Sequence, residues 1–305
     1  MVMASIFVQI ASYHDFELPK TVIDAVAKSS GNHVICFGVH NCYIENHQIF
    51  IPMVPNFRMQ ETQAPENIGV GLGRSIANSL YNGQDYYLQV DGHTRFYQNW
   101  DDELIRNILE MQAQGIKKPL LSAYPSSYSY NNNLKEHCDW DRSVTSISFA
   151  EKPEQFEQTL IPSQLAVPSE GGIKQTSISA GFIFTLGEFA YLGFNEKIMF
   201  WGEEILIAAR AYTNGFDLMI PDKQYIYHLY YDHSSVFQKN LRRHVWKDYP
   251  DQYHAKDLES KAEVYDILST ARIGKDALGT QRTLDEYGQY AGLDFKNKAV
   301  IIKGE

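Results

Sequence analysis

Two features are scarce in this sequence, and each scarcity excludes a class of protein. Among 305 residues there are only three cysteines, Cys36, Cys42 and Cys138, and none forms a Cys-x-x-Cys pair. Neither a disulfide framework nor a structural zinc site is therefore indicated. No apolar run approaches the roughly 20 residues that cross a bilayer, and the first ten residues lack the basic start and cleavage site of a signal peptide. We expect an unsecreted, cytoplasmic protein without a transmembrane segment.

Positive charge is also limited. The sequence has 27 Lys and Arg against 37 Asp and Glu, a net charge of -10, and its one basic cluster is the short run Arg242-Arg243-His244. Phosphate-backbone binding needs clustered basic residues, so a broad nucleic-acid surface is excluded. The 20 tyrosines and 16 phenylalanines are generous for a hydrophobic content of 44%. Surplus tyrosine suits polar ligands such as sugars and equally suits a well-packed sheet.

The hydrophobic pattern predicts an α/β fold. A β-rich run over Ser5–Tyr13, apolar residues at helical spacing over 18–28 and a buried strand over Val34–Val39 form a βαβ opening. Strand patterns return at 85–90, 119–124, 179–184, 217–220 and 224–230, with helices at 75–81, 104–112 and 203–212. The glycines at 69, 71 and 73 follow a loop and lack the spacing of a dinucleotide-binding fingerprint. We expect one α/β domain over residues 1–250 and a helical extension over 251–305 that packs on it.

Two long polar segments, 41–66 and 124–172, read as irregular loops. They are rich in Tyr, Asn, Ser and Pro. Loops of this length in a compact fold are more often functional than idle. We expect these two segments to shape an acceptor site.

A metal site is predicted where the strand over 85–90 ends. Asp91, Gly92 and His93 follow Val90 directly, at the edge of an α/β sheet where ligands gather. A carboxylate and an imidazole there could hold a divalent cation against a diphosphate leaving group. Alone, the triplet also fits a strand-ending turn with an Asx hydrogen bond.

Two further elements carry candidate chemistry. Trp201, Gly202, Glu203 and Glu204 precede a helix, where acids could either cap the helix dipole or orient an acceptor hydroxyl. His228 follows a strand in the run Tyr225–Tyr231 and could be a metal ligand or a hydrogen-bonded, half-buried histidine.

Five motifs in order make the sequence similar to one known family. They are Phe7-Val8-x-Ile10-Ala11-Ser12-Tyr13-x-Asp15, Gly71-x-Gly73-Arg74, Asp85-Tyr86-Tyr87-Leu88-Gln89-x-Asp91-x-His93-x-Arg95-Phe96, Phe200-Trp201-Gly202-Glu203-Glu204-Ile205 and Tyr227-His228. Segments over 278–287 and 292–295 are also similar. Together they resemble the Skp1 hydroxyproline N-acetylglucosaminyltransferase family, glycosyltransferase family 60, over nearly the whole chain.

The resemblance implies a GT-A glycosyltransferase fold, Rossmann-like, with a mixed central sheet flanked by helices. It implies a retaining hexosyltransferase that uses Mn2+ or Mg2+ and a UDP-sugar, expected to be UDP-GlcNAc. It also implies roles for individual residues: a uridine pocket from Ser12, Tyr13 and Asp15, donor contact from Arg74, metal ligation by Asp91, His93 and His228, and a sugar and acceptor face from Trp201, Glu203 and Glu204. Gly92 stands near the ribose where the family is expected to have Ser.

The sequence therefore predicts a metal-dependent glycosyltransferase that acts on a hydroxyl of a protein or glycan. A metal-dependent hydrolase is one alternative, although a second metal would need more Asp and His ligands. The other alternative is a non-catalytic carbohydrate-binding or nucleotide-sugar-binding protein of the same fold. Such a protein would not need the acids Asp91, Glu203 and Glu204. Whether Glu203 or Glu204 acts in catalysis stays open.

Overall fold

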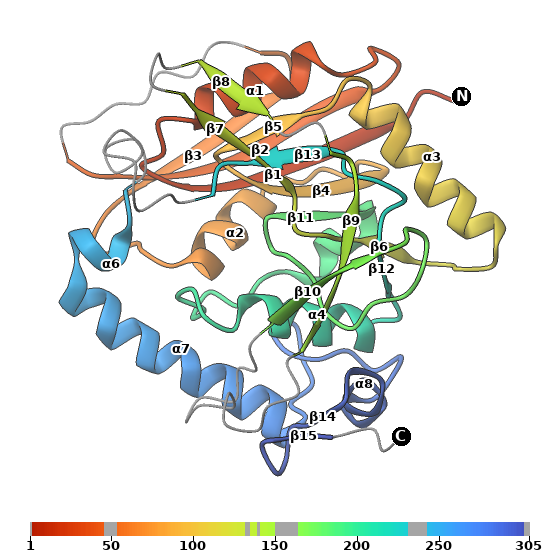
Figure 1. The fold of residues 1–305 in the computed structure, drawn as a ribbon. Helices are drawn as coiled ribbons and strands as arrows, with labels where there is room; N and C mark the ends of the chain where they lie inside the picture. Colours follow the sequence, from red (N-terminus) through yellow and green to blue (C-terminus); the bar gives the residue numbers. More distant parts are fainter. Residues whose placement is uncertain are drawn as a thin grey trace.

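A seven-stranded mixed sheet forms the centre of the protein (Figure 1). The computed structural model describes residues 2–45, 54–131, 135–138, 141–149, 164–230 and 243–301. Across the sheet the strands follow the order β12 (Asp217–Met219), β6 (Pro119–Leu121), β11 (Phe182–Leu186), β4 (Tyr86–Asp91), β1 (Ser5–Tyr13), β2 (Val34–Tyr43) and β3 (Phe57–Gln63). The strands from β4 to β3 are parallel, and β11 is antiparallel to both β4 and β6. The carboxyl ends of β1, β2 and β4 therefore meet at one edge.

Alternation along β1 gives the sheet two apolar faces. Ile6, Val8 and Ile10 pack on one side with helices α1 (Leu18–Ala27) and α3 (Trp100–Ala113). Phe7 points to the other side, which is covered by α2 (Val70–Asn78) and α4 (Glu203–Thr213) (Figure 1). Successive strand side chains point to opposite faces, so a nearly continuous apolar strand is what a sheet covered on both faces requires.

A smaller, four-stranded sheet lies beside α1. Its order is β5 (Thr94–Phe96), β13 (Ile226–His228), β7 (Ser126–Tyr130) and β8 (Glu136–Cys138). The antiparallel pairing of β5 with β13 sets Thr94 opposite His228. Two separate ribbons pair β9 (Val144–Phe149) with β10 (Gln164–Ser169) and β14 (Leu293–Asp294) with β15 (Ala299–Val300). The small sheet brings the segment around residue 228 against the turn after β4.

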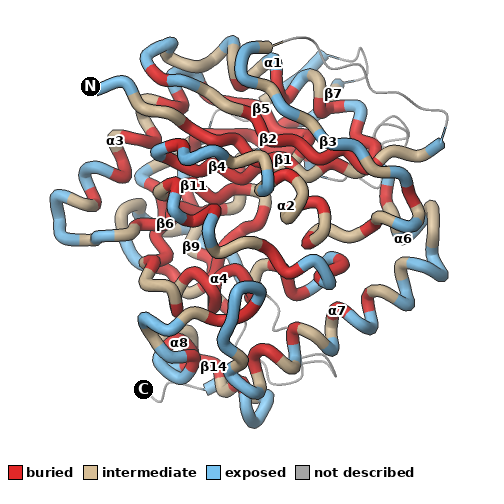
Figure 2. Tube along the Cα trace, turned by 180° about the vertical axis from the view of Figure 1, so that it is seen from behind, coloured by how far each residue is buried: buried red, intermediate tan, exposed pale blue. Residues whose placement is uncertain are grey.

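The C-terminal part of the described chain is mainly helical. The 3-10 helix η2 (Gly187–Leu192) precedes α4, and α6 (Val245–Asp248), α7 (Pro250–Thr270) and α8 (Leu284–Ala291) follow β13. Figure 2 shows α7 along the outside of the molecule with its buried residues on one side. Val264, Ile267 and Leu268 of α7 belong to the same apolar cluster as α4. The division at residue 250 stays a prediction.

The expected α/β class and the mixed central sheet with flanking helices are confirmed. Within the described residues, no helix has the length and apolar content that a membrane span needs.

The interpretation of 41–66 and 124–172 as irregular loops was wrong in part. β2 continues to Tyr43, β3 lies at the sheet edge, and β7, β8, β9 and β10 lie in the second segment. β3 was missed because an exposed edge strand such as Phe57–Gln63 carries mostly polar residues and lacks an apolar run. Parts of both segments, 46–53, 132–134, 139–140 and 150–163, lie outside the described residues.

The glycines of the 69–73 run allow close packing of α2. A Cβ on Gly71 would lie 2.1 Å from the backbone oxygen of Asn195, and one on Gly73 would lie 3.0 Å from Nδ1 of His40. The sequence placed the start of this helix at Ser75, but α2 begins at Val70. Glycine inside a helix usually costs stability, and here it lets two segments approach α2.

Candidate active site

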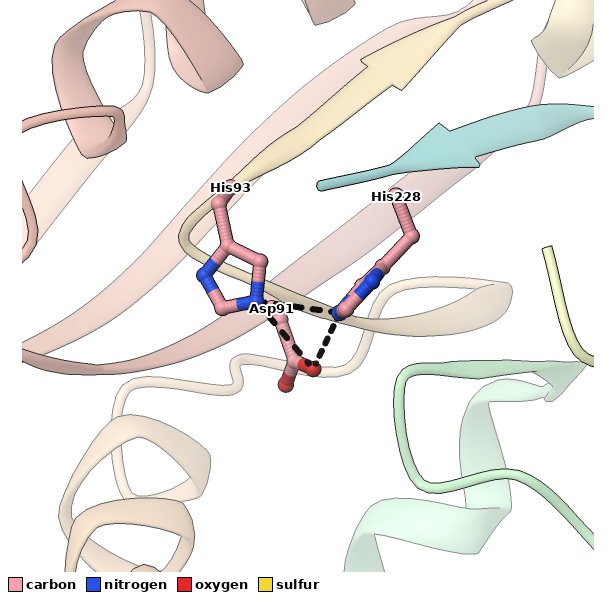
Figure 3. Close-up of side chains that lie close together, drawn as sticks. All are labelled: Asp91, His93 and His228. Atoms are coloured by element: carbon pink, nitrogen blue, oxygen red, sulfur yellow. Dashed lines mark hydrogen bonds and ion pairs between the residues drawn. The ribbon is translucent and has the colours of Figure 1, made fainter. Parts of the chain in front are cut away.

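Asp91, His93 and His228 converge at the edge where β4 ends (Figure 3). Asp91 is the last residue of β4, His93 lies in the turn to β5, and His228 ends β13. Nε2 of His228 lies 2.9 Å from Nε2 of His93 and 3.2 Å from Oδ2 of Asp91. Nε2 of His93 lies 3.9 Å from that same oxygen. Residues 137 positions apart thus present three potential ligand atoms to one point.

These three atoms suit a divalent cation. Two ligands at right angles with bonds of about 2.1 Å lie about 3 Å apart, close to the two shorter separations observed. One carboxylate oxygen with two imidazole nitrogens is a donor set that first-row cations such as Mn2+ accept. A cation would also relieve the close approach of two imidazole nitrogens, since neutral imidazoles can share only one proton there. The residues present therefore fit a metal site.

The orientation of His93 is fixed by Asp15. Oδ2 of Asp15 lies 2.6 Å from Nδ1 of His93, and Oδ1 accepts a hydrogen bond from the backbone N–H of Glu17 at 2.9 Å. Both side chains are buried. A carboxylate on Nδ1 holds the proton on that nitrogen and leaves Nε2 for a metal, as is usual for metal-binding histidines.

Arg74 lies buried beneath the site and joins two of its acids. Nη2 donates to Oδ1 of Asp91 at 2.9 Å, and Nε donates to Oε1 of Glu203 at 3.1 Å. Its other hydrogen bonds, all shorter than 3.4 Å, go to the side chain of Gln9 and to the backbone oxygens of Val90 and Ala180. A guanidinium has five N–H groups, and five acceptors surround this one. Contact of Arg74 with a donor stays a prediction; in this structure its hydrogen bonds are used within the protein.

The charge of Arg74 acts on both acids that it contacts. Burial alone would raise the pKa of Asp91, but the hydrogen bond from His228 and the charge of Arg74 lower it well below its usual range. Burial raises the pKa of Glu203, and Arg74 opposes that rise. Asp91 is therefore ionised and available as a ligand.

Glu204 has a different environment from its neighbour Glu203. Its Oε1 accepts a hydrogen bond from the backbone N–H of Ala180 at 3.0 Å. Burial is the main cause that raises the pKa of Glu204 to about 7, and the bond from Ala180 opposes it. Both acids open α4 after Gly202, which has a φ of 91°. Glu203 is thus committed to Arg74, whereas Glu204 can gain or lose a proton near neutral pH.

Two tyrosines lie near Glu204, and an exposed tryptophan precedes the two acids in the chain. Trp201 is 55% exposed and contacts the ring of Phe200 edge to face, with ring centres 5.5 Å apart. After burial, the charge of Glu204 contributes to raising the pKa of both Tyr124 and Tyr230. The ring of Tyr230 also lies 4.5 Å from that of His228. An exposed Trp side chain can contact a sugar ring.

The residues expected to contact uridine point in different directions. Ser12 and Asp15 flank Gly92, where an added Cβ would lie 3.3 Å from Oδ2 of Asp15 and 3.5 Å from Oγ of Ser12. Tyr13 donates instead to Oδ2 of Asp248 in α6, at 3.0 Å. Their contact with uridine stays a prediction.

Three residues at the site were missed from the sequence. Gln9 and Gln89 lie within buried strands and bond to the backbone of Arg74 and Ala180 respectively. A glutamine inside an apolar strand was the available signal, since a buried polar side chain needs a partner. Gly181 faces the site, because an added Cβ there would lie 3.1 Å from Oδ2 of Asp91 and 3.7 Å from His228. It lay inside a predicted strand and gave no separate signal.

One family model and two solved structures are similar to this chain. The model of the family described as Glycosyltransferase (GlcNAc) matches residues 47–297. No curated protein sequence matches the chain. A crystal structure of GalNAc-T7 with UDP, GalNAc and Mn2+ is similar at 12% identity and a TM-score of 0.45, over 98% of this chain and 59% of that one. A crystal structure of S. aureus TarS is similar at 14% identity and a TM-score of 0.45, over 88% of this chain and 42% of that one. The chain thus spans less than two thirds of either structure.

Proposed function

The chain belongs to the Glycosyltransferase (GlcNAc) family, and from this premise we propose that it transfers GlcNAc from UDP-GlcNAc, with retention, to a hydroxyl of a protein or glycan. A divalent cation, Mn2+ or Mg2+, is held by Asp91, His93 and His228. The narrower resemblance to the Skp1 hydroxyproline N-acetylglucosaminyltransferase family is part of this proposal. The observation that carries it is the convergence of these three ligands beside two helix-opening acids.

The cation, when bound, neutralises the negative charge that develops on the departing diphosphate. Other residues of the chain hold the metal ligands in place before the cation and the donor bind. Asp15 presents Nε2 of His93 toward the other ligands, and Arg74 holds Asp91 ionised and in place. These preorganised contacts need no rearrangement when the donor binds, which is what favours the transition state over the ground state.

Glu204 is the better candidate for contact with the acceptor. Its pKa near 7 allows it to accept and release a proton at neutral pH, as a residue that orients a hydroxyl should. Glu203 accepts a hydrogen bond from Arg74 and is 9% exposed, which favours a structural role for it. The exposed ring of Trp201 would provide a face for a sugar. No covalent nucleophile is assigned.

The test is a panel of UDP-sugars incubated with the protein and Mn2+, with released UDP measured with and without candidate acceptors. The proposal predicts release of UDP from UDP-GlcNAc that is faster than from other UDP-sugars, abolished by a chelator and accelerated by a hydroxyl acceptor. Metal-independent release, or release only from a different sugar, would contradict it. Metal-dependent cleavage that no acceptor accelerates would favour the hydrolase alternative, and UDP-sugar binding without turnover would favour a binding protein.

A further inference from the structure

The hydroxyl of Thr21, on the first turn of α1, bonds to the backbone on both sides of His93. Oγ1 accepts from the N–H of Thr94 at 2.9 Å and lies 2.7 Å from the oxygen of Gly92 and 2.9 Å from that of Thr94. Thr21 is fully buried. A buried hydroxyl that both donates and accepts fixes the position of the backbone it contacts.

The same helical turn also holds the ring of His93. The backbone N–H of Glu17 donates to Asp15, and Asp15 contacts Nδ1 of His93. The N–H of Thr21 in turn donates to the backbone oxygen of Glu17 at 2.9 Å. The ring and the backbone of His93 are therefore both fixed from the start of α1.

The side chain of Glu17 anchors this turn to β5 on the far side of His93. Glu17 is fully buried and pairs with Arg95, which is 2% exposed. Tyr128 donates to Oε2 of Glu17 at 3.0 Å, and the hydroxyl of Tyr130 lies 2.8 Å from the same oxygen. A buried charge paired and hydrogen-bonded in this way is costly to disturb and so resists movement. Arg95 belongs to a motif that the proposed transfer reaction does not otherwise use.

We propose that Glu17 and Thr21 are positioning residues that direct Nε2 of His93 toward Asp91 and His228 and thereby set the affinity of this site for a divalent cation. Thr21 follows Glu17, the N-cap residue of α1, by four positions, so the two lie on one side of the start of this helix. Thr21 contacts the backbone of Gly92, which precedes His93, and of Thr94, which follows it. Glu17 pairs with Arg95, two residues after His93. Thr94 also pairs with His228, so a shift of this segment would move both histidines. The inference rests on the proposed metal site.

The direct test is Mn2+ affinity, measured by calorimetry on the unliganded protein without any turnover. Thr21→Val keeps the shape and removes the hydroxyl, whereas Thr21→Ser keeps the hydroxyl. Loss of an outer contact of a metal ligand typically weakens binding by 10- to 100-fold, so Thr21→Val should bind Mn2+ about tenfold more weakly or worse. Thr21→Ser should stay within about threefold of the unmodified protein.

Thr185→Val is the matched control. Thr185 is also fully buried and donates from Oγ1 to a backbone oxygen, that of Pro119, at 2.8 Å. It lies on β11 opposite Tyr87, four residues before Asp91 on β4. It should lose thermal stability with unchanged Mn2+ affinity, which separates a positioning effect from a loss of stability.

Glu17→Gln provides a second variant should Thr21→Val not fold, and it too should weaken Mn2+ binding by about tenfold. If folded variants at both positions bind Mn2+ as tightly as the unmodified protein does, the positioning inference alone is overturned. If the unmodified protein binds Mn2+ no better than Asp91→Asn does, the proposed metal site itself is wrong, and the positioning inference falls with it.

Discussion

Arg74 donates a hydrogen bond from Nη2 to Oδ1 of Asp91 over 2.9 Å, and its guanidinium is buried behind the candidate metal site. Asp91 therefore offers one oxygen to Arg74 and the other, Oδ2, to the two histidines. The same guanidinium contacts Glu203 at the start of α4. The buried guanidinium of Arg74 thus joins the proposed metal ligand Asp91 to the acids expected near the acceptor.

Replacing Arg74 by Lys keeps the charge and removes the planar set of donors. Since Lys cannot satisfy five acceptors, the free energy of unfolding should fall by about 1–3 kcal/mol, the usual cost of leaving buried hydrogen-bonding groups unsatisfied. Denaturant unfolding measures this. Had Arg74 mainly contacted the donor, Arg74→Lys would instead lose UDP affinity with its stability intact.

Replacing Glu204 by Gln should lower turnover by about 10²-fold or more and leave UDP affinity unchanged. The reason is that the amide keeps the shape of the carboxyl but cannot accept a proton from a hydroxyl. Initial rates and calorimetry on the same preparation check both parts. A fall in melting temperature with turnover preserved would show that Glu204 only caps α4.

Glu203→Gln is the matched control for that variant. Glu203 is bound to Arg74, so its replacement should mainly cost stability, because it removes a negative charge that faces a buried guanidinium. A larger loss of turnover per folded molecule in Glu203→Gln than in Glu204→Gln would exchange the roles assigned to the two acids.

The pKa of Glu204 predicts a pH dependence of stability. Folding raises it from 4.5 to about 7, so the protonated carboxyl is favoured in the folded state. The favourable contribution of this carboxyl to the free energy of unfolding is fully present below about pH 4.5 and is lost as pH rises through about 7. Across that window the unmodified protein should lose about 1–3 kcal/mol relative to Glu204→Gln. If the free energy of unfolding depends on pH in the same way for both proteins, folding does not raise the pKa of Glu204.

Gly181→Ala should crowd the metal site directly. The added methyl would lie 3.1 Å from Oδ2 of Asp91, the oxygen that faces both histidines. Mn2+ affinity should therefore fall by about tenfold, in line with other changes that displace a ligand. Calorimetry measures the affinity, and a value equal to that of the unmodified protein would show that Asp91 has room to move.

The sequence was sufficient for the central elements and for the placement of Asp91 and His93 at the end of β4. Buried strands such as β1 and β4 carry long apolar runs, and Asp91 and His93 stand directly after one of them, where the fold places ligands. His228 required the resemblance, because no local pattern distinguishes a ligand from a half-buried histidine. Its position against His93 depends on the pairing of β5 with β13, which is a long-range contact.

The contacts that support the site could not be predicted. Thr21 reads as an ordinary helix residue, and its bonds to the backbone around His93 appear only when α1 packs beside the β4–β5 turn. Donor contact by Arg74 was expected only from the family resemblance, and its hydrogen bonds to Asp91 and Glu203 depend on the packing of α2. Strand β3 has an exposed, polar sequence that resembles a loop.

The most direct test of the account is the metal dependence of UDP binding. UDP affinity is measured by calorimetry in Mn2+, in excess chelator, and in Mn2+ for Asp91→Asn, which keeps an oxygen for Arg74 but loses the charge that binds a cation. Asp85→Asn, at the amino end of the same strand, is the control. If Asp91 holds the cation that binds the diphosphate, UDP affinity should fall by about 10²-fold both in chelator and in Asp91→Asn and stay unchanged in Asp85→Asn. Equal UDP affinity with and without metal would contradict the account.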